Sequence, residues 1–86
     1  MSKAKREYRL QNSVARQLSK RELFLLLCDA FAAENLSPIS PGQEEGLRKA
    51  AEWIKDGLIE WRRVERAIQD NDWDPADGPR DILGPG

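Results

Sequence analysis

The feature that most constrains this chain of 86 residues is the apolar run from Leu23 to Phe31, which only Asp29 interrupts with a charge. Ser19 and Glu22 precede it at the spacing of a capping box. In that motif the serine hydroxyl accepts a hydrogen bond from an orphan backbone N–H, and the glutamate reaches back to the serine N–H. The pattern predicts a helix that is apolar almost all the way round and forms the buried centre of the fold.

A second strong helical pattern begins at Ser40. Asn35 is expected as a left-handed C-cap of the preceding helix, because Pro38 prevents that helix from continuing. Ser40-Pro41-Gly42-Gln43 then supplies an N-cap serine, a proline at the first position and a glutamine at the third. Apolar residues keep helical spacing to about Gln69 and fill a sector about 160° wide. They are Leu47, Ala50, Ala51, Trp53, Ile54, Gly57, Leu58, Trp61, Val64 and Ile68.

The sequence allows two local structures at Gly57, in the middle of this pattern. Gly57 could end the helix in a Schellman turn, with Leu58 packing back onto Trp53. We favour a continuous helix, because the apolar phase runs through Gly57 and no N-cap residue precedes Ile59, which alone points away from the sector. Such a helix would be about 44 Å long, against about 30 Å for a compact monomer of this size.

The two ends of the chain differ in charge. Residues 1–22 carry seven Lys or Arg against two Glu, whereas residues 69–86 carry one Arg against five Asp. The N-terminal part predicts a weak, charged helix from about Lys3 to Leu18. The density of Gly and Pro after Gln69 predicts an irregular segment.

These patterns predict an all-α fold of about three helices: the weak N-terminal helix, the buried apolar helix and the long helix, with or without a bend at Gly57. We expect a single helical domain over residues 1–69, with a basic segment at 1–22, and an acidic Pro/Gly-rich tail over 70–86.

Residue types that carry most protein chemistry are scarce. The chain has no His, so the commonest zinc ligand and general base is missing, and its one cysteine excludes an internal disulfide. Cys28 lies within the apolar run, where a buried thiol is inert. Asp70, Asp72 and Asp74 resemble the opening of a calcium loop, but Pro75 replaces the glycine that the loop needs. We therefore expect no enzyme, no metal and no cofactor.

No stretch approaches the roughly 18 apolar residues of a membrane span, so we expect no membrane partner. A single unpaired cysteine suits a reducing compartment, which predicts a cytoplasmic protein.

Three tryptophans are unusual in so short a chain. Trp53 and Trp61 lie on the apolar sector, where core packing is the default. Trp73 lies among aspartates, so that it either contacts a partner or folds back over the helix end. Exposed aromatic residues ringed by polar ones often anchor protein interfaces. The candidate partner-binding residues are Trp53, Leu58, Ile59, Trp61, Trp73, Asp70, Asp72 and Asp74.

By elimination, these features favour a small protein-binding regulator or inhibitor, such as a phage or mobile-element accessory protein that blocks a host enzyme or complex. An acidic helical surface suits docking on a basic enzyme. The segment Ser19–Phe31 slightly resembles the first helices of bacteriocin immunity proteins, which are acidic, helical and of this size. The paired tyrosines that those proteins present are missing here, so the resemblance assigns no residue.

The alternative is a nucleic-acid-binding module that grips phosphates with the basic segment 3–21. Its candidate residues are Lys3, Lys5, Arg6, Arg9, Arg16, Lys20 and Arg21. A helical structural or assembly subunit is a third, weaker option.

We also expect a homodimer built on the third helix. A core this small has no disulfide or metal to support it. The apolar sector is wider than one neighbouring helix covers, and an unbroken helix would extend beyond a compact monomer.

Overall fold

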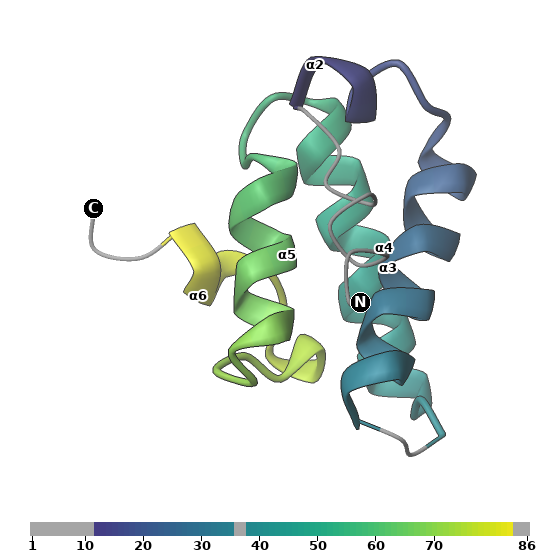
Figure 1. The fold of residues 1–86 in the computed structure, drawn as a ribbon, viewed down its shortest axis with the longest axis vertical. Coiled ribbons are helices and arrows are strands. Elements are labelled where there is room, and N and C mark those ends of the chain that lie inside the picture. Colours follow the sequence, from purple (N-terminus) through teal and green to yellow (C-terminus); the bar gives the residue numbers. More distant parts are fainter. Residues whose placement is uncertain (1–11, 36–37, 84–86) are drawn as a thin grey trace, which may run out of the picture.

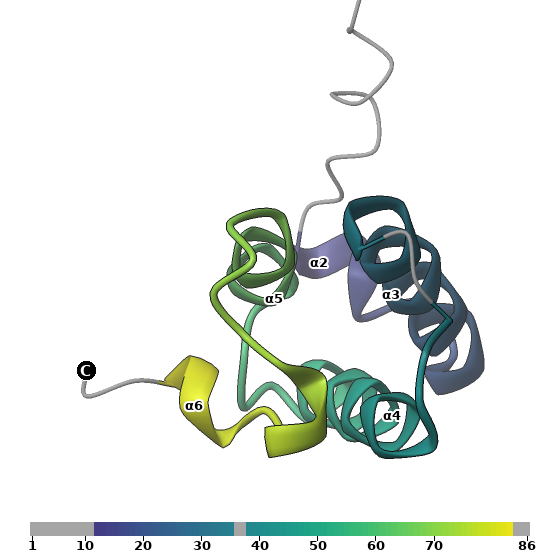
Figure 2. The ribbon, with the colours of Figure 1, turned by 90° about the horizontal axis from the view of Figure 1, so that it is seen from below.

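The computed structural model describes residues 12–35 and 38–83. They form α2 (Asn12–Ala15), α3 (Lys20–Asn35), α4 (Pro41–Lys55), α5 (Trp61–Gln69), the 3-10 turn η1 (Pro75–Asp77) and α6 (Arg80–Leu83). None of these described residues is in a strand, which confirms the all-α expectation. The three longer helices, α3, α4 and α5, pack together, and α2 lies across one end of them (Figure 1). Seen from below, they surround a common core, with η1 and α6 beside α4 and α5 (Figure 2).

Both predicted capping boxes are present. The backbone N–H of Glu22 donates to Ser19 Oγ at 3.1 Å, and the N–H of Ser19 donates to Glu22 Oε1 at 2.9 Å. Ser40 and Gln43 repeat the reciprocal pair, with both distances at 3.1 Å. Each box satisfies two N–H groups that the first turn of a helix leaves without a partner. The starts of α3 and α4 are therefore set by local sequence.

The prediction of a continuous third helix is wrong. The structure instead has a Schellman turn at Gly57. Gly57 adopts a left-handed conformation with φ of 79°. The N–H of Leu58 donates to the Trp53 carbonyl at 2.9 Å, and that of Gly57 donates to the Ile54 carbonyl at 3.1 Å. The longest dimension of the molecule is 34 Å, which is shorter than the about 44 Å of a straight helix over residues 41–69. The chain therefore turns after Lys55 and returns as α5.

The end of α5 repeats this turn with an asparagine. Asn71 has a φ of 58°, and its N–H donates to the Ile68 carbonyl at 3.1 Å. Asparagine is the commonest substitute for glycine at this position. The expected left-handed C-cap at Asn35 is wrong, because Asn35 belongs to the last turn of α3. Its side-chain amide instead donates to the Phe31 carbonyl, one turn back along the helix, at 2.9 Å.

The segment after Gln69 is more regular than its Gly and Pro content predicts. Asp74 caps η1 by accepting from the N–H of Ala76 at 3.0 Å. Pro75 is buried against α4, where Gly46 leaves room for its carbonyl group. Because α6 follows η1, regular structure continues to Leu83.

At the other end, the expected helix from Lys3 to Leu18 is described only from residue 12 onward, where α2 ends at Ala15. Ala15 is buried in the core. Among the residues that the structure describes, no helix is both long and apolar enough to cross a membrane.

Side chains from every described helix and from the loops between them meet in one core. α3 packs on α4 and on α5, and α4 also packs on η1. The buried apolar residues are Ala15, Leu23, Leu27, Phe31, Leu47, Ala50, Ala51, Ile54, Ile59, Trp61, Val64, Ile68, Trp73 and Ile82.

Candidate functional site

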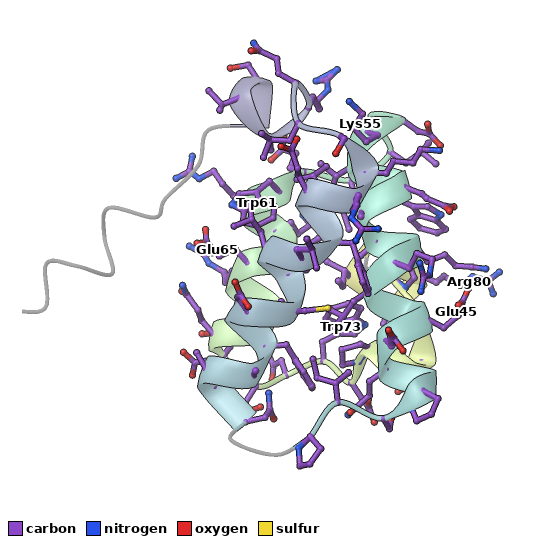
Figure 3. The ribbon with its side chains drawn as sticks, turned by 90° about the vertical axis from the view of Figure 1, so that its right-hand side faces the viewer. Glu45, Lys55, Trp61, Glu65, Trp73 and Arg80 are labelled. Carbon is purple, nitrogen blue, oxygen red and sulfur yellow. The ribbon has the colours of Figure 1, made fainter. Side chains whose placement is uncertain are left out.

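Two of the three tryptophans belong to the core. Trp61 is 4% exposed and Trp73 is 7% exposed (Figure 3). The indole N–H of Trp73 donates to the Gly78 carbonyl at 2.8 Å, whereas that of Trp61 is buried with no acceptor among the described residues. Trp53 is half-buried on α4. Trp73 therefore folds back onto the helices, which is one of the two alternatives that the sequence left open.

The turn at Gly57 reverses which of the two following residues is buried and which is exposed. Leu58 is 57% exposed and Ile59 is buried, the reverse of what a continuous helix predicts. The physical reason is the left-handed conformation of Gly57, which breaks the helical repeat and rotates the chain before α5 begins.

The three aspartates lie at the other end of α5 from Leu58. Asp70, Asp72 and Asp74 are exposed and follow this nine-residue helix, whereas Leu58 precedes it. Asp74 also has a structural role, because it caps η1 and accepts from Gln43 Nε2 at 3.2 Å. The structure therefore does not bring the candidate partner-binding residues together on one surface.

A different apolar surface is exposed on α3. Only one face of this helix, formed by Leu23, Leu27 and Phe31, is buried. Leu25 lies on the opposite side and is 49% exposed, and Leu26, about 100° round the helix from Leu25, is 38% exposed. Ala32 and Ala33, two turns further along, are exposed as well, with Asp29 between the two pairs. We call Leu25, Leu26, Ala32 and Ala33 the outer face of α3.

The sequence contained the information for this surface, but burial all round the helix was the wrong interpretation. A helix that packs against two neighbours, as α3 packs on α4 and α5, buries only the sides turned towards them. The remaining apolar side chains of the Leu23–Phe31 run are then left in solvent. Scattered exposed apolar residues are ordinary in proteins, whereas adjacent ones on one helix face are typical of interaction surfaces.

A basic hollow of about 310 Å³ adjoins the outer face, between the start of α3 and the second half of α4. Its lining residues are Lys20, Arg21, Phe24, Leu25, Arg48 and Glu52. The guanidinium carbon of Arg48 lies 4.8 Å from the centroid of the Phe24 ring, within the range of a cation–π contact. Sequence reasoning missed Phe24, Leu25 and Arg48, because nothing local indicates that α4 brings Arg48 beside α3.

The basic residues of the nucleic-acid alternative divide into two groups. Lys3, Lys5, Arg6 and Arg9 lie outside the described residues. Arg16, Lys20 and Arg21 are exposed. Lys20 and Arg21 line the basic hollow, while the carbonyl of Arg16 accepts from Lys55 Nζ at 2.7 Å and joins the α2 end to α4.

A larger hollow, of about 450 Å³, lies along α5. Three arginines and two glutamates line it, together with one glutamine, so that its charges nearly balance: Glu60, Arg62, Arg63, Glu65, Arg66 and Gln69. It contains no apolar residue for a partner to cover, which makes it the weaker candidate for docking.

Cys28 is half-buried between α3 and α4, and is less enclosed than the sequence predicts. Burial raises the pKa of the Cys28 thiol above its ordinary value, and the neighbouring carboxylates of Glu44 and Asp29 raise this pKa further, while Arg48 lowers it. Because the thiolate is the reactive form, a raised pKa makes the native thiol slow to react near neutral pH.

We therefore expect a thiol reagent at pH 7.4 to modify Cys28 several times more slowly in the native protein than in denaturant. The native rate should keep rising with pH beyond the point where an unperturbed cysteine levels off. Stopped-flow absorbance with a disulfide reagent measures both rates. Native labelling as fast as that of the unfolded chain would show that neither burial nor the carboxylates protect the thiol.

Comparison of the chain with protein-family models, curated proteins and solved structures finds no match.

Proposed function

We propose that this chain is a small, non-catalytic, protein-binding regulator or inhibitor, and that the outer face of α3 is its docking surface. The observation that carries this proposal is the exposure of Leu25 and Leu26, at 49% and 38%, at consecutive positions of one helix. Fully burying a leucine side chain contributes about 1.5–3 kcal/mol. A partner that covers both side chains therefore gains a useful fraction of that energy.

The remaining residues of the outer face suit such a contact. Ala32 and Ala33 have short side chains, so a partner backbone can approach α3 closely at its second half. Asp29 is the one charged residue between Leu23 and Ala33, and a single polar residue in an apolar helix–helix contact fixes the register of that contact.

A regulator of this kind acts by occupying a surface of its target and needs no catalytic group. We propose the same class as the sequence favours, a phage or mobile-element accessory protein that blocks a host enzyme or complex. The single thiol suits the reducing cytoplasm.

Nucleic-acid binding is the second candidate, because Lys20, Arg21 and Arg48 lie around one hollow. Phosphate contacts require such cations. The adjoining outer face of α3 supports the protein partner instead, since exposed leucines offer nothing to a phosphate backbone.

A homodimer remains a prediction, but its expected surface changes. The break at Gly57 removes the protruding helix, and the core takes up Ile59 and Trp61. A second copy would therefore meet the outer face of α3 rather than the third helix predicted from sequence.

The docking surface is tested with Leu25→Glu and Leu26→Glu, each of which places a carboxylate where an apolar contact is expected. Leu58→Glu is the matched control, because Leu58 is also an exposed leucine but lies in the turn between α4 and α5. All three variants should stay within about 0.5 kcal/mol of the wild type in unfolding free energy, as exposed substitutions usually do.

A photo-crosslinking amino acid at position 33, expressed in the native host, should yield a specific adduct that Leu25→Glu and Leu26→Glu each reduce at least about tenfold. Leu58→Glu should leave the yield unchanged. Sedimentation equilibrium shows whether the captured partner is a second copy. An adduct that persists in both α3 variants would contradict docking on this face.

A further inference from the structure

The hollow between α3 and α4 has a net positive lining. Lys20 and Arg21 come from the first turn of α3, and Arg48 and Glu52 come from α4. Three cations therefore face one carboxylate. The hollow continues into the outer face of α3 through Leu25, which belongs to both surfaces.

The Arg48 guanidinium is positioned to contact a second carboxylate in addition to that of Glu45. Its guanidinium lies over the Phe24 ring, which orients the planar group. Its contact with Glu45 is long, at 3.7 Å, and both side chains are at least half exposed. An exposed pair of this kind is weak. A carboxylate that approaches from the hollow can therefore share this guanidinium at small cost.

The positive charge of the groove between α3 and α4 is concentrated near the start of α3. At the start of α3 the groove carries Lys20 and Arg21. Further along, Cys28 lies within the electrostatic reach of two carboxylates, Glu44 and Asp29, as well as of Arg48. Figure 3 looks onto this side of the molecule, with α3 and α4 side by side. A ligand in the groove would therefore meet the densest positive charge near the start of α3, around the hollow.

Resting on the proposed docking at α3, we propose that the partner presents an acidic amphipathic helix. Its carboxylates lie against Lys20, Arg21 and Arg48, and its apolar side chains cover Phe24 and Leu25, the residue that the hollow shares with the outer face of α3. A groove between two antiparallel helices accepts a third helix, whose apolar side chains recur every three or four residues. The three cations of the hollow set its direction, with the acidic end of the partner helix over the start of α3.

The test is selection from a display library of random helical peptides on the immobilised full-length protein. We expect the selected peptides to combine Asp or Glu at one end with Leu, Ile or Phe at helical spacing. Fluorescence anisotropy then measures the affinity of a selected peptide for each variant, at two ionic strengths. Higher ionic strength should weaken the binding, because salt screens exposed charges.

Arg21→Glu combined with Arg48→Glu should weaken a selected peptide at least about tenfold, the effect of losing about 1.4 kcal/mol. Lys49→Glu combined with Arg66→Glu is the matched control. It changes the net charge by the same amount at exposed residues that do not line the hollow, and should alter affinity less than about twofold. Circular dichroism shows whether both variants remain folded.

Selected peptides without acidic residues, or equal losses in the two double variants, would overturn the proposal. A third outcome would also overturn it: no acidic peptide is selected, but a single-stranded oligonucleotide binds tightly, and Arg21→Glu combined with Arg48→Glu abolishes that binding while the control double variant does not. If the crosslink at position 33 forms but no acidic peptide is selected, docking at α3 stands and the acidic partner is rejected. If neither the crosslink nor an acidic peptide is obtained, both proposals are rejected.

Discussion

Replacing Trp73 with alanine should lower the free energy of unfolding by about 3–5 kcal/mol, the usual cost of removing a buried large aromatic side chain. Trp73 is 7% exposed, and its indole N–H donates to the Gly78 carbonyl at 2.8 Å. The substitution therefore opens a cavity and leaves a carbonyl without its donor. A small domain is stable by only about 5–15 kcal/mol in total, so a large part of its stability depends on this one side chain.

Chemical denaturation followed by circular dichroism measures the effect. Trp53→Ala is the control, because Trp53 is only half-buried and should cost distinctly less. Trp73→Phe keeps most of the ring and removes the hydrogen bond, and should cost about 1 kcal/mol for the bond, together with the smaller contact area. A loss below about 1 kcal/mol in Trp73→Ala would mean that the segment after Gln69 does not contribute to the core.

Gly46→Ala should destabilise the protein by about 3 kcal/mol, at the upper end of overpacking costs. A methyl group on Gly46 would occupy the space of the Pro75 carbonyl group. Neither backbone can move aside easily, since α4 is a regular helix and Pro75 is held in η1. The added methyl therefore forces η1 off α4 and exposes the neighbouring part of the core.

Gly42→Ala is the matched control on the same helix. A methyl there would lie 3.6 Å from the Cβ of Ala76, an ordinary van der Waals contact. Replacing a helical glycine with alanine usually stabilises by about 0.5–1 kcal/mol, so this variant should equal or exceed the wild type. Equal effects of the two substitutions in thermal unfolding would show that η1 does not pack on Gly46.

Features that depend on a few neighbouring residues could be predicted from sequence. Ser19 with Glu22, and Ser40 with Gln43, form the capping boxes that their spacing indicates. In each case the donor and the acceptor lie three residues apart, so no distant part of the chain is needed. The all-α class follows from the same local patterns.

The break at Gly57 was one of two structures that the local pattern left open. The apolar phase continues through Gly57, so spacing alone favours one helix. The structure instead gains a third helix that packs on α3, and Gly57 adopts the left-handed conformation at little steric cost. The same choice buries Ile59 and Trp61 and exposes Leu58.

The candidate site depended on tertiary structure for the same reason. Sequence alone located the apolar run from Leu23 to Phe31, but the positions of α4 and α5 decide that Leu27 is buried and that Leu25 is exposed. Arg48 reaches Phe24 only because α4 lies antiparallel beside α3. Gly46 likewise accommodates Pro75 across a long sequence separation.

The sequence by itself therefore determined the helical class, the caps that begin α3 and α4, and the residue types available for chemistry. Only the tertiary structure decided where the chain turns back, which apolar residues remain in solvent and which charges share one groove. The physical reason is the sequence distance over which each kind of interaction acts. Capping and helical spacing are interactions within one or two turns, whereas burial is shared among all the helices that compete for a small core.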